Sequence, residues 1–259
     1  MLAALATSGA GCALGAGAAV AQAPGKGSKS QAAGPPAQLH VGFAPKRLGA
    51  ATTISFTIVI DPSAADQPPA LSAIDLSYPR GLGFATSGLG LASCDPARLQ
   101  SEGASACPAN ARMGGGDALA RVAFGPMLVS ERVGLSLFAG PSPNGYLHLL
   151  VLASGSEPVE ARIVMTGVLL PGHLKITVPP VPGLPGAGDV ALTQVHATLG
   201  GALTYYERVR DRLVAYRPKG VSLPPRCPRG GWQVGATLAF AGGAFSRAEQ
   251  VIGCPARSG

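Results

Sequence analysis

Charged and aromatic side chains are scarce in this sequence. Of its 259 residues, 13% are charged and 5% are aromatic, and a single one is a tryptophan. Sugar-binding surfaces use several exposed aromatic faces, so a carbohydrate-binding module is disfavoured. Glycine (37) and proline (24) together approach a quarter of the chain. That share lies just below the range typical of disordered proteins, so the hydrophobic pattern has to decide whether the chain folds.

Catalytic motifs are missing as well. The sequence contains no H-E-x-x-H, G-x-S-x-G or P-loop pattern, and the run from Gly81 fails G-x-G-x-x-G because Thr86 takes its last position. The glycines 114–116 could present backbone amides to a ligand, but a tight turn before a strand at Ala118 is the favoured interpretation. Histidines are expected at sheet margins rather than as metal ligands. They are His40, His148, His173 and His196. No catalytic residue, metal ligand or cofactor is therefore predicted.

Closely spaced cysteines are absent too. Zinc sites and thioredoxin-like redox pairs both use C-x-x-C spacing, and neither Cys94 nor Cys107 has such a neighbour. Structural disulfides are the leading interpretation, and proximity along the chain favours Cys94 with Cys107 and Cys227 with Cys254. Loops of this length should each stabilise the fold by roughly 3 to 4 kcal/mol.

The N-terminal segment predicts an oxidising compartment, which disulfides need. Residues 1–23 have no charged side chain and end in Ala21-Gln22-Ala23, as a cleavable export signal does, although no Lys or Arg opens the segment. The segment is too rich in Gly and Ala for a membrane span. The residues before Cys12 lack the aliphatic side chain of a lipoprotein signal. We expect a secreted protein, free or associated with the cell envelope, whose mature chain has no transmembrane span.

Apolar and polar residues alternate repeatedly after a flexible linker at 24–37. Residues 52–60, for example, place Ile54, Phe56 and Ile58 on one face, which is typical of a half-buried strand. Similar runs lie at 73–78, 118–124, 132–138, 146–153, 159–169, 173–178, 190–199, 233–240 and 246–252. The turn residues 141–145 connect two of them as a hairpin. This pattern predicts an all-β fold over residues 38–259, an antiparallel β-sandwich or two packed β units.

Two segments interrupt the strands. Asp95 is suited to cap a short helix over 95–103, with Pro96 in its first turn and Gly103 at its end. The proline-rich run 179–189 is either a crossover within one sheet or a boundary between two domains, and the crossover is favoured.

Positive charge is concentrated between Glu207 and Arg229. Seven cationic and two acidic side chains leave a net charge of +5 in this basic strip, out of +7 for the chain. Its cations are Arg208, Arg210, Arg212, Arg217, Lys219, Arg226 and Arg229. An edge hairpin that turns near Arg210-Asp211 is expected. The charges either prevent edge-to-edge aggregation or bind an anionic cell-wall polymer or lipid headgroups, and export makes nucleic acid the least suitable anion.

Two motifs resemble those of exported, β-rich proteins of high-GC actinobacteria. They are GLGLASCDPARLQSEGASACPANARMGGG (88–116) and PPRCPRGGWQVGATLAFAGG (224–243), the latter followed by Cys254-Pro255. The resemblance extends from about residue 50 onward. It implies a secreted, β-sandwich-like protein with paired cysteines, and it implies no activity. Many such proteins have an Asp-Gly turn where this chain has Ala241-Gly242-Gly243.

Together these features predict a secreted or envelope-associated, non-catalytic β protein with a structural or binding role. The alternative is an extracellular hydrolase of carbohydrate or ester substrates, with a site assembled from dispersed loops. A deep cleft in which His148, His173 or His196 meets carboxylates or a serine would favour the hydrolase.

Overall fold

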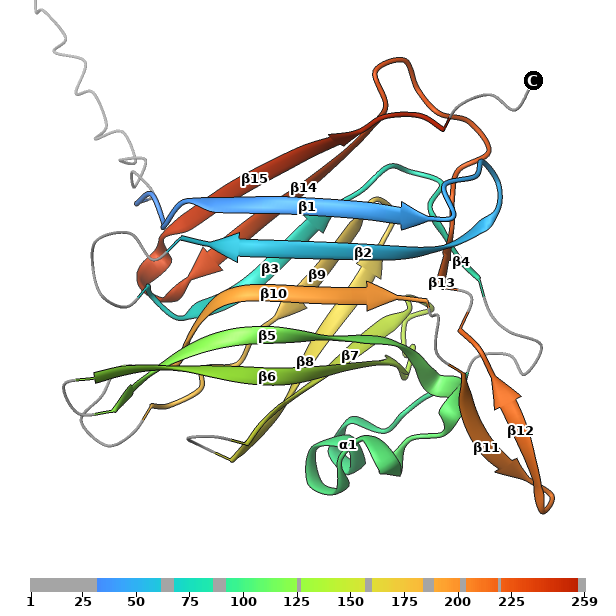
Figure 1. Cartoon of the computed structure of the whole chain (residues 1–259), viewed down its shortest axis with the longest axis horizontal. Helices are drawn as coiled ribbons and strands as arrows, with labels where there is room; N and C mark the ends of the chain where they lie inside the picture. Colours follow the sequence, from blue (N-terminus) through green and yellow to red (C-terminus); the bar gives the residue numbers. More distant parts are fainter. Residues whose placement is uncertain are drawn as a thin grey trace, which may run out of the picture. The chain divides into compact units, whose positions relative to one another are not determined.

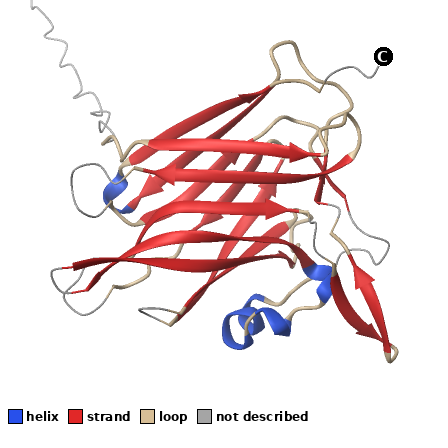
Figure 2. Cartoon of the chain, viewed as in Figure 1, coloured by secondary structure: helices blue, strands red, loops and turns tan. Residues whose placement is uncertain are grey.

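Antiparallel strands make up most of the fold (Figures 1 and 2). The computed structural model describes residues 32–61, 68–85, 92–124, 127–156, 160–183, 189–200, 204–218 and 220–255. The predicted export signal at 1–23 and the linker residues 24–31 lie outside the described residues.

The strands are β1 (Ala37–Ala44), β2 (Ala51–Ile60), β3 (Leu71–Ser77), β4 (Gly83–Ala85), β5 (Arg112–Phe124), β6 (Met127–Gly140), β7 (His148–Gly155), β8 (Ala161–Leu170), β9 (His173–Thr177), β10 (Ala191–Leu199), β11 (Tyr205–Val209), β12 (Arg212–Tyr216), β13 (Gly220–Ser222), β14 (Trp232–Phe240) and β15 (Phe245–Ile252). The helices are α1 (Pro96–Glu102) and the 3₁₀ turns η1 (Ala104–Ala106), η2 (Ala109–Ala111) and η3 (Ala241–Gly243).

Thirteen of the strands form one hydrogen-bonded sheet in the order β15-β14-β3-β9-β8-β7-β6-β5-β10-β2-β13-β4, with β1 also paired to β2. The chain then meets itself where β1 runs beside β15 (Figure 1). Just before β1, the Gly34 N–H donates to the Phe245 carbonyl at 2.8 Å. Within β1, the Val41 N–H donates to Oε1 of Gln250. The sheet from β15 to β1 therefore nearly closes around one interior.

The all-β, antiparallel fold class is confirmed. A strand is present at each of the ten predicted positions, whereas β1, β4 and β13 were not predicted. β4 and β13 have only three residues each, too few to show a period of two. The described end of the predicted linker, residues 32–36, lies against β15, where the Ser246 hydroxyl donates to the Pro35 carbonyl. Residues 184–188 of the proline-rich run lie outside the described residues, and β9 and β10, which flank the run, belong to the one sheet.

The interior is filled by the inward-facing residues of the alternating strands. Leu238 is 0% exposed and Ile58 is 1% exposed, and both belong to a single large apolar cluster. Trp232 is 1% exposed and packs edge-on against Phe43, with ring centroids 5.8 Å apart. Burial of this apolar surface is the main favourable contribution to folding.

A second apolar cluster covers the opposite face of β6 and β7. Phe138, Leu150 and Leu152 alternate with residues of the main core, so they point to the other side of the sheet. Leu99 of α1 and Cys94 pack onto them. Both faces of these strands are therefore buried. The expected alternation over 146–153 is wrong for this reason, because β7 is a continuous apolar run from Leu149 to Ala153.

The short helix predicted at 95–103 is confirmed as α1. Asp95 caps it, since its Oδ1 accepts a hydrogen bond from the Arg98 N–H at 2.8 Å. Gly103 ends it with φ of 84°. The side chain of Gln100 ties the helix to β8, because its Oε1 accepts from the Val164 N–H at 2.9 Å.

The prediction of a turn at Gly114–Gly116 is wrong. These glycines lie inside β5, where they pair with β10. A Cβ on Gly116 would lie 2.0 Å from the carbonyl oxygen of His196, and one on Gly114 would lie 1.9 Å from that of Thr198. The glycines are needed for the close approach of two backbones, because any side chain at either position would collide with β10.

Candidate functional site

The basic strip begins in the hairpin of β11 and β12, which forms a small sheet of its own and carries three arginines beside Glu207 and Asp211. Tyr205 pairs with Tyr216 and Val209 with Arg212, so the turn consists of Arg210 and Asp211, as predicted. Both turn residues have positive φ, 47° and 62°. A two-residue hairpin turn of this kind matches the twist of its strands but normally uses Asn-Gly or Asp-Gly. In Figure 1 the hairpin extends away from the main sheet.

Replacing Asp211 with glycine should stabilise the hairpin by about 0.5 to 1 kcal/mol, because glycine adopts positive φ without a steric penalty. Hydrogen exchange of the β11 and β12 amides is then expected to slow by roughly two- to five-fold. Asp61→Gly is the matched control, since Asp61 is also exposed but is not among the residues with positive φ. Equal effects of the two substitutions on their local amides would contradict the expected relief of strain.

The two faces of the hairpin differ in composition. Tyr206 and Leu213 are 65% and 67% exposed, and Arg208 stands directly opposite Leu213. Glu207 and Val214, on the other face, are half-buried. We call the exposed set the hairpin patch. It consists of Tyr206, Arg208, Leu213 and Ala215 on one face, Val209 and Arg212 at the end of the other face, and the turn residues Arg210 and Asp211, with a net charge of +2. Large apolar side chains beside three arginines are unusual on a surface that meets only water.

The base of the hairpin is fixed to the main sheet through Arg112 of β5. Its guanidinium carbon lies 4.6 Å from the ring centroid of Tyr205 and 5.6 Å from that of Phe138. Its Nη2 donates to the Ser136 hydroxyl at 3.1 Å. Tyr216 is 1% exposed, and burial raises its pKa, with a further contribution from Tyr205. The tip is thus exposed while the base is held by a cation stacked between two rings.

The cations of the basic strip fall into two groups. Arg208, Arg210 and Arg212 belong to the hairpin, and Arg217 follows it. Arg226 and Arg229 lie in the loop that precedes β14, which Figure 1 places at the other end of the molecule from the hairpin tip. Lys219 lies outside the described residues.

The four cysteines are paired as the sequence predicted. Cys94 is bonded to Cys107 and Cys227 to Cys254, with Cα atoms 5.0 and 5.8 Å apart. The first bond closes the segment that carries α1, and part of that segment shares a groove with Arg112 and β11. The second joins the loop before β14 to the end of β15. Each disulfide therefore holds a compact unit at the margin of the sheet.

The histidines are dispersed over separate strands. His173 Nδ1 lies 3.0 Å from Asp75 Oδ1 on β3, and His196 Nδ1 lies 2.9 Å from the Thr57 hydroxyl on β2. The two pairs involve different strands, and no histidine lines the five best-formed pockets of the described residues. None of these five pockets is therefore the deep histidine-lined cleft that would favour a hydrolase.

Within the described ranges, no group of three or more His, Cys, Asp or Glu side chains is placed to hold a metal ion. None of the described helices is both long enough and apolar enough to cross a membrane. Comparison with protein-family models, curated proteins and solved structures gives no match for this chain.

Proposed function

We propose that this chain is an exported, non-catalytic binding protein of the cell envelope, and that its hairpin patch contacts an anionic lipid surface. The observation that carries the proposal is the exposure of Tyr206 and Leu213 beside Arg208. Arginine attracts anionic headgroups, while tyrosine and leucine favour the boundary between headgroups and acyl chains. An anionic cell-wall polymer would use the arginines but would gain little from the exposed apolar side chains.

The proposed location has support from the covalent structure and the sequence. Disulfides form and persist in oxidising environments outside the cytosol, and two of them are present. Residues 1–23 read as an export signal, and the two cysteine motifs resemble those of exported actinobacterial proteins. These observations support the proposed location in the envelope or outside the cell.

Replacing Arg208, Arg210 and Arg212 together with serine should weaken binding to phosphatidylglycerol vesicles by roughly 100-fold, since each such cation contributes about 1 kcal/mol near an anionic surface. Co-sedimentation with vesicles measures the effect. Binding of the unaltered protein should fall steeply as salt shortens the screening length below about 8 Å. The triple variant should keep the fold of the wild type, because exposed charges contribute little to stability.

Two further variants sharpen this experiment. The double variant Arg226→Ser/Arg229→Ser removes cations far from the hairpin and should leave most of the binding intact. Leu213→Ser should weaken vesicle binding without altering retention on isolated cell walls. Equal vesicle binding by the wild type and the triple variant would show that the hairpin is only a solvated edge. A third outcome would identify an anionic polymer, not a lipid surface, as the partner. In that outcome the wild type does not bind vesicles, its retention on cell walls falls as salt rises, and Leu213→Ser is retained on cell walls as well as the wild type.

A further inference from the structure

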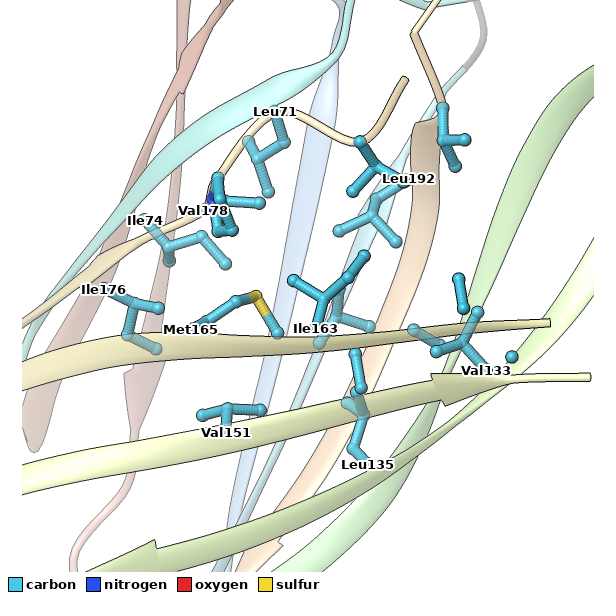
Figure 3. A pocket seen from close by; sticks show the side chains of 18 of the residues that line it. Leu71, Ile74, Val133, Leu135, Val151, Ile163, Met165, Ile176, Val178 and Leu192 are labelled. Atoms are coloured by element: carbon cyan, nitrogen blue, oxygen red, sulfur yellow. The ribbon is translucent and has the colours of Figure 1, made fainter. Parts of the chain in front are cut away.

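A cavity of about 140 Å³ lies inside the nearly closed sheet. Its walls come from β2, β3, β5 to β10 and the segment that follows β9. Figure 3 shows aliphatic side chains from several strands, Val151, Met165 and Ile176 among them, directed into this space. Of the described residues that line it, Glu131 alone has a polar side chain.

Small side chains at inward-facing positions create this space. Ala118 on β5 and Ala197 on β10 are each 2% exposed and line the cavity, and so do Ala153 and Ala161 on β7 and β8. Side chains just fill the interior of an eight-stranded closed sheet, and more strands enclose a larger volume. The nearly closed path here has eleven strands from β15 to β1, so alanines in its wall leave room for a ligand.

The lining determines which ligand would be stable there. A cavity of roughly 150 Å³ with aliphatic and aromatic walls stays free of water and takes up a molecule such as benzene. Apart from Glu131, the cavity in this protein has walls of the same character, and its volume is similar. An apolar ligand would make dispersion contacts that the walls of the empty cavity lack.

Glu131 is the first residue of β6 that lines the cavity. Leu137, Leu135, Val133 and Glu131 follow one another at every second position of β6, and all four line it. Glu131 is 5% exposed. A carboxylate accepts several hydrogen bonds at once, and at short range it repels a second carboxylate. A ligand whose polar end donates a hydrogen bond suits this residue, whereas a fatty acid does not.

We propose that the cavity binds a slender alkyl chain whose polar end, a hydroxyl or an amino group, donates a hydrogen bond to Glu131. The site is separate from the hairpin patch and shares no residue with it, so the two proposals can fail independently. In particular, the triple arginine variant should bind alkyl ligands as the wild type does.

Titration calorimetry of the purified protein at neutral pH tests the ligand class, with octan-1-ol, octylamine and octanoate as ligands. Octan-1-ol and octylamine are expected to bind at least about ten-fold more tightly than octanoate, because only octanoate brings a second negative charge to Glu131. Glu131→Gln should reduce this preference several-fold, since the amide is uncharged and no longer repels octanoate, whereas the cost of burying the charge of octanoate is the same in both proteins. Binding of none of the three ligands, or equal binding of octanoate and octan-1-ol by the wild type, would overturn the proposal.

Two variants that change the cavity volume test the location. Ala197→Val fills part of the space and should weaken the binding of octan-1-ol at least about ten-fold. Ala236→Val is the control and should leave this binding unchanged, because Ala236 is also 2% exposed but does not line the cavity. Leu135→Ala enlarges the cavity and should raise the affinity for decan-1-ol relative to that for octan-1-ol. This variant tests the location of the site if Ala197→Val does not fold. Circular dichroism checks the folding of each variant. Unchanged affinities in Ala197→Val and Leu135→Ala would place any binding elsewhere.

Discussion

Replacing Gly116 with alanine is expected to lower the free energy of unfolding by about 3 kcal/mol or more, at the upper end of the effects of overpacking. The new Cβ would lie 2.0 Å from the His196 carbonyl oxygen and 2.8 Å from the Cα of Ala197. Both are backbone atoms of β10, so no side-chain rotation relieves the collision. β5 would have to separate from β10 in the middle of the sheet, where their pairing spans Gly114 to Arg121. Urea denaturation followed by the fluorescence of Trp232 measures the loss.

Gly134→Ala is the matched control for this substitution. Gly134 also lies inside a strand, β6, and pairs with Asp117, the residue next to Gly116. The nearest atom to its added Cβ is the Ser154 carbonyl oxygen at 3.8 Å, an ordinary contact distance. Alanine there should leave stability unchanged or raise it slightly, because glycine has more conformational entropy to lose on folding. Similar stability of the Gly116 and Gly134 variants would contradict the close approach of β5 and β10.

Replacing Cys94 with serine should lower the free energy of unfolding by about 2 to 5 kcal/mol, the range for loss of a native disulfide. Cys94 is 1% exposed and packs with Leu99 and Phe138 in the second apolar cluster, on the opposite face of β6 and β7 from the main core. The substitution therefore removes the crosslink to Cys107 and also places a hydroxyl among apolar side chains. Because Phe138 also lies beside Arg112, the base of the hairpin should become more accessible to proteolysis. Urea denaturation and limited proteolysis measure the two effects.

Ser93→Ala is the control for the disulfide variant, since Ser93 is the exposed neighbour of Cys94 and forms no crosslink. It should leave stability within about 0.5 kcal/mol of the wild type. Peptide mapping of the exported protein without reduction should recover the pairs Cys94–Cys107 and Cys227–Cys254. Free thiols at all four positions would contradict both the disulfides and the proposed compartment.

The strands were predictable because a strand buried on one face alternates between apolar and polar residues, whatever it pairs with. β2 and β14 show this alternation in the sequence, and both appear in the structure. The helix α1 and the hairpin turn at Arg210-Asp211 were also predictable, since caps and turns depend on a few adjacent residues. β1 was not, because its first residues follow the Gly- and Pro-rich linker and its position depends on distant contacts with β2 and β15.

Part of the candidate site was predictable from the sequence, and part was not. Arg208, Arg210 and Arg212 could be placed together on a hairpin because local pairing decides their positions. Their separation from Arg226 and Arg229 depends on β13, which pairs with β2 and β4 far away in the chain. No local pattern distinguishes one edge of a sheet from another. The exposure of Leu213 could not be predicted either, because it depends on which hairpin face packs against the main sheet.

The sequence by itself determined the fold class, the location of most strands, the capped helix and the cysteine pairing, because each depends on residues that are near one another in the chain. Tertiary structure alone decided that β1 meets β15, that Gly116 approaches His196, and that alanines from β5 and β10 leave a cavity lined by Glu131. The physical reason is that strand order and interior volume depend on pairings between distant segments. A period of two specifies which face of a strand is buried, but not which strand lies beside it or opposite it.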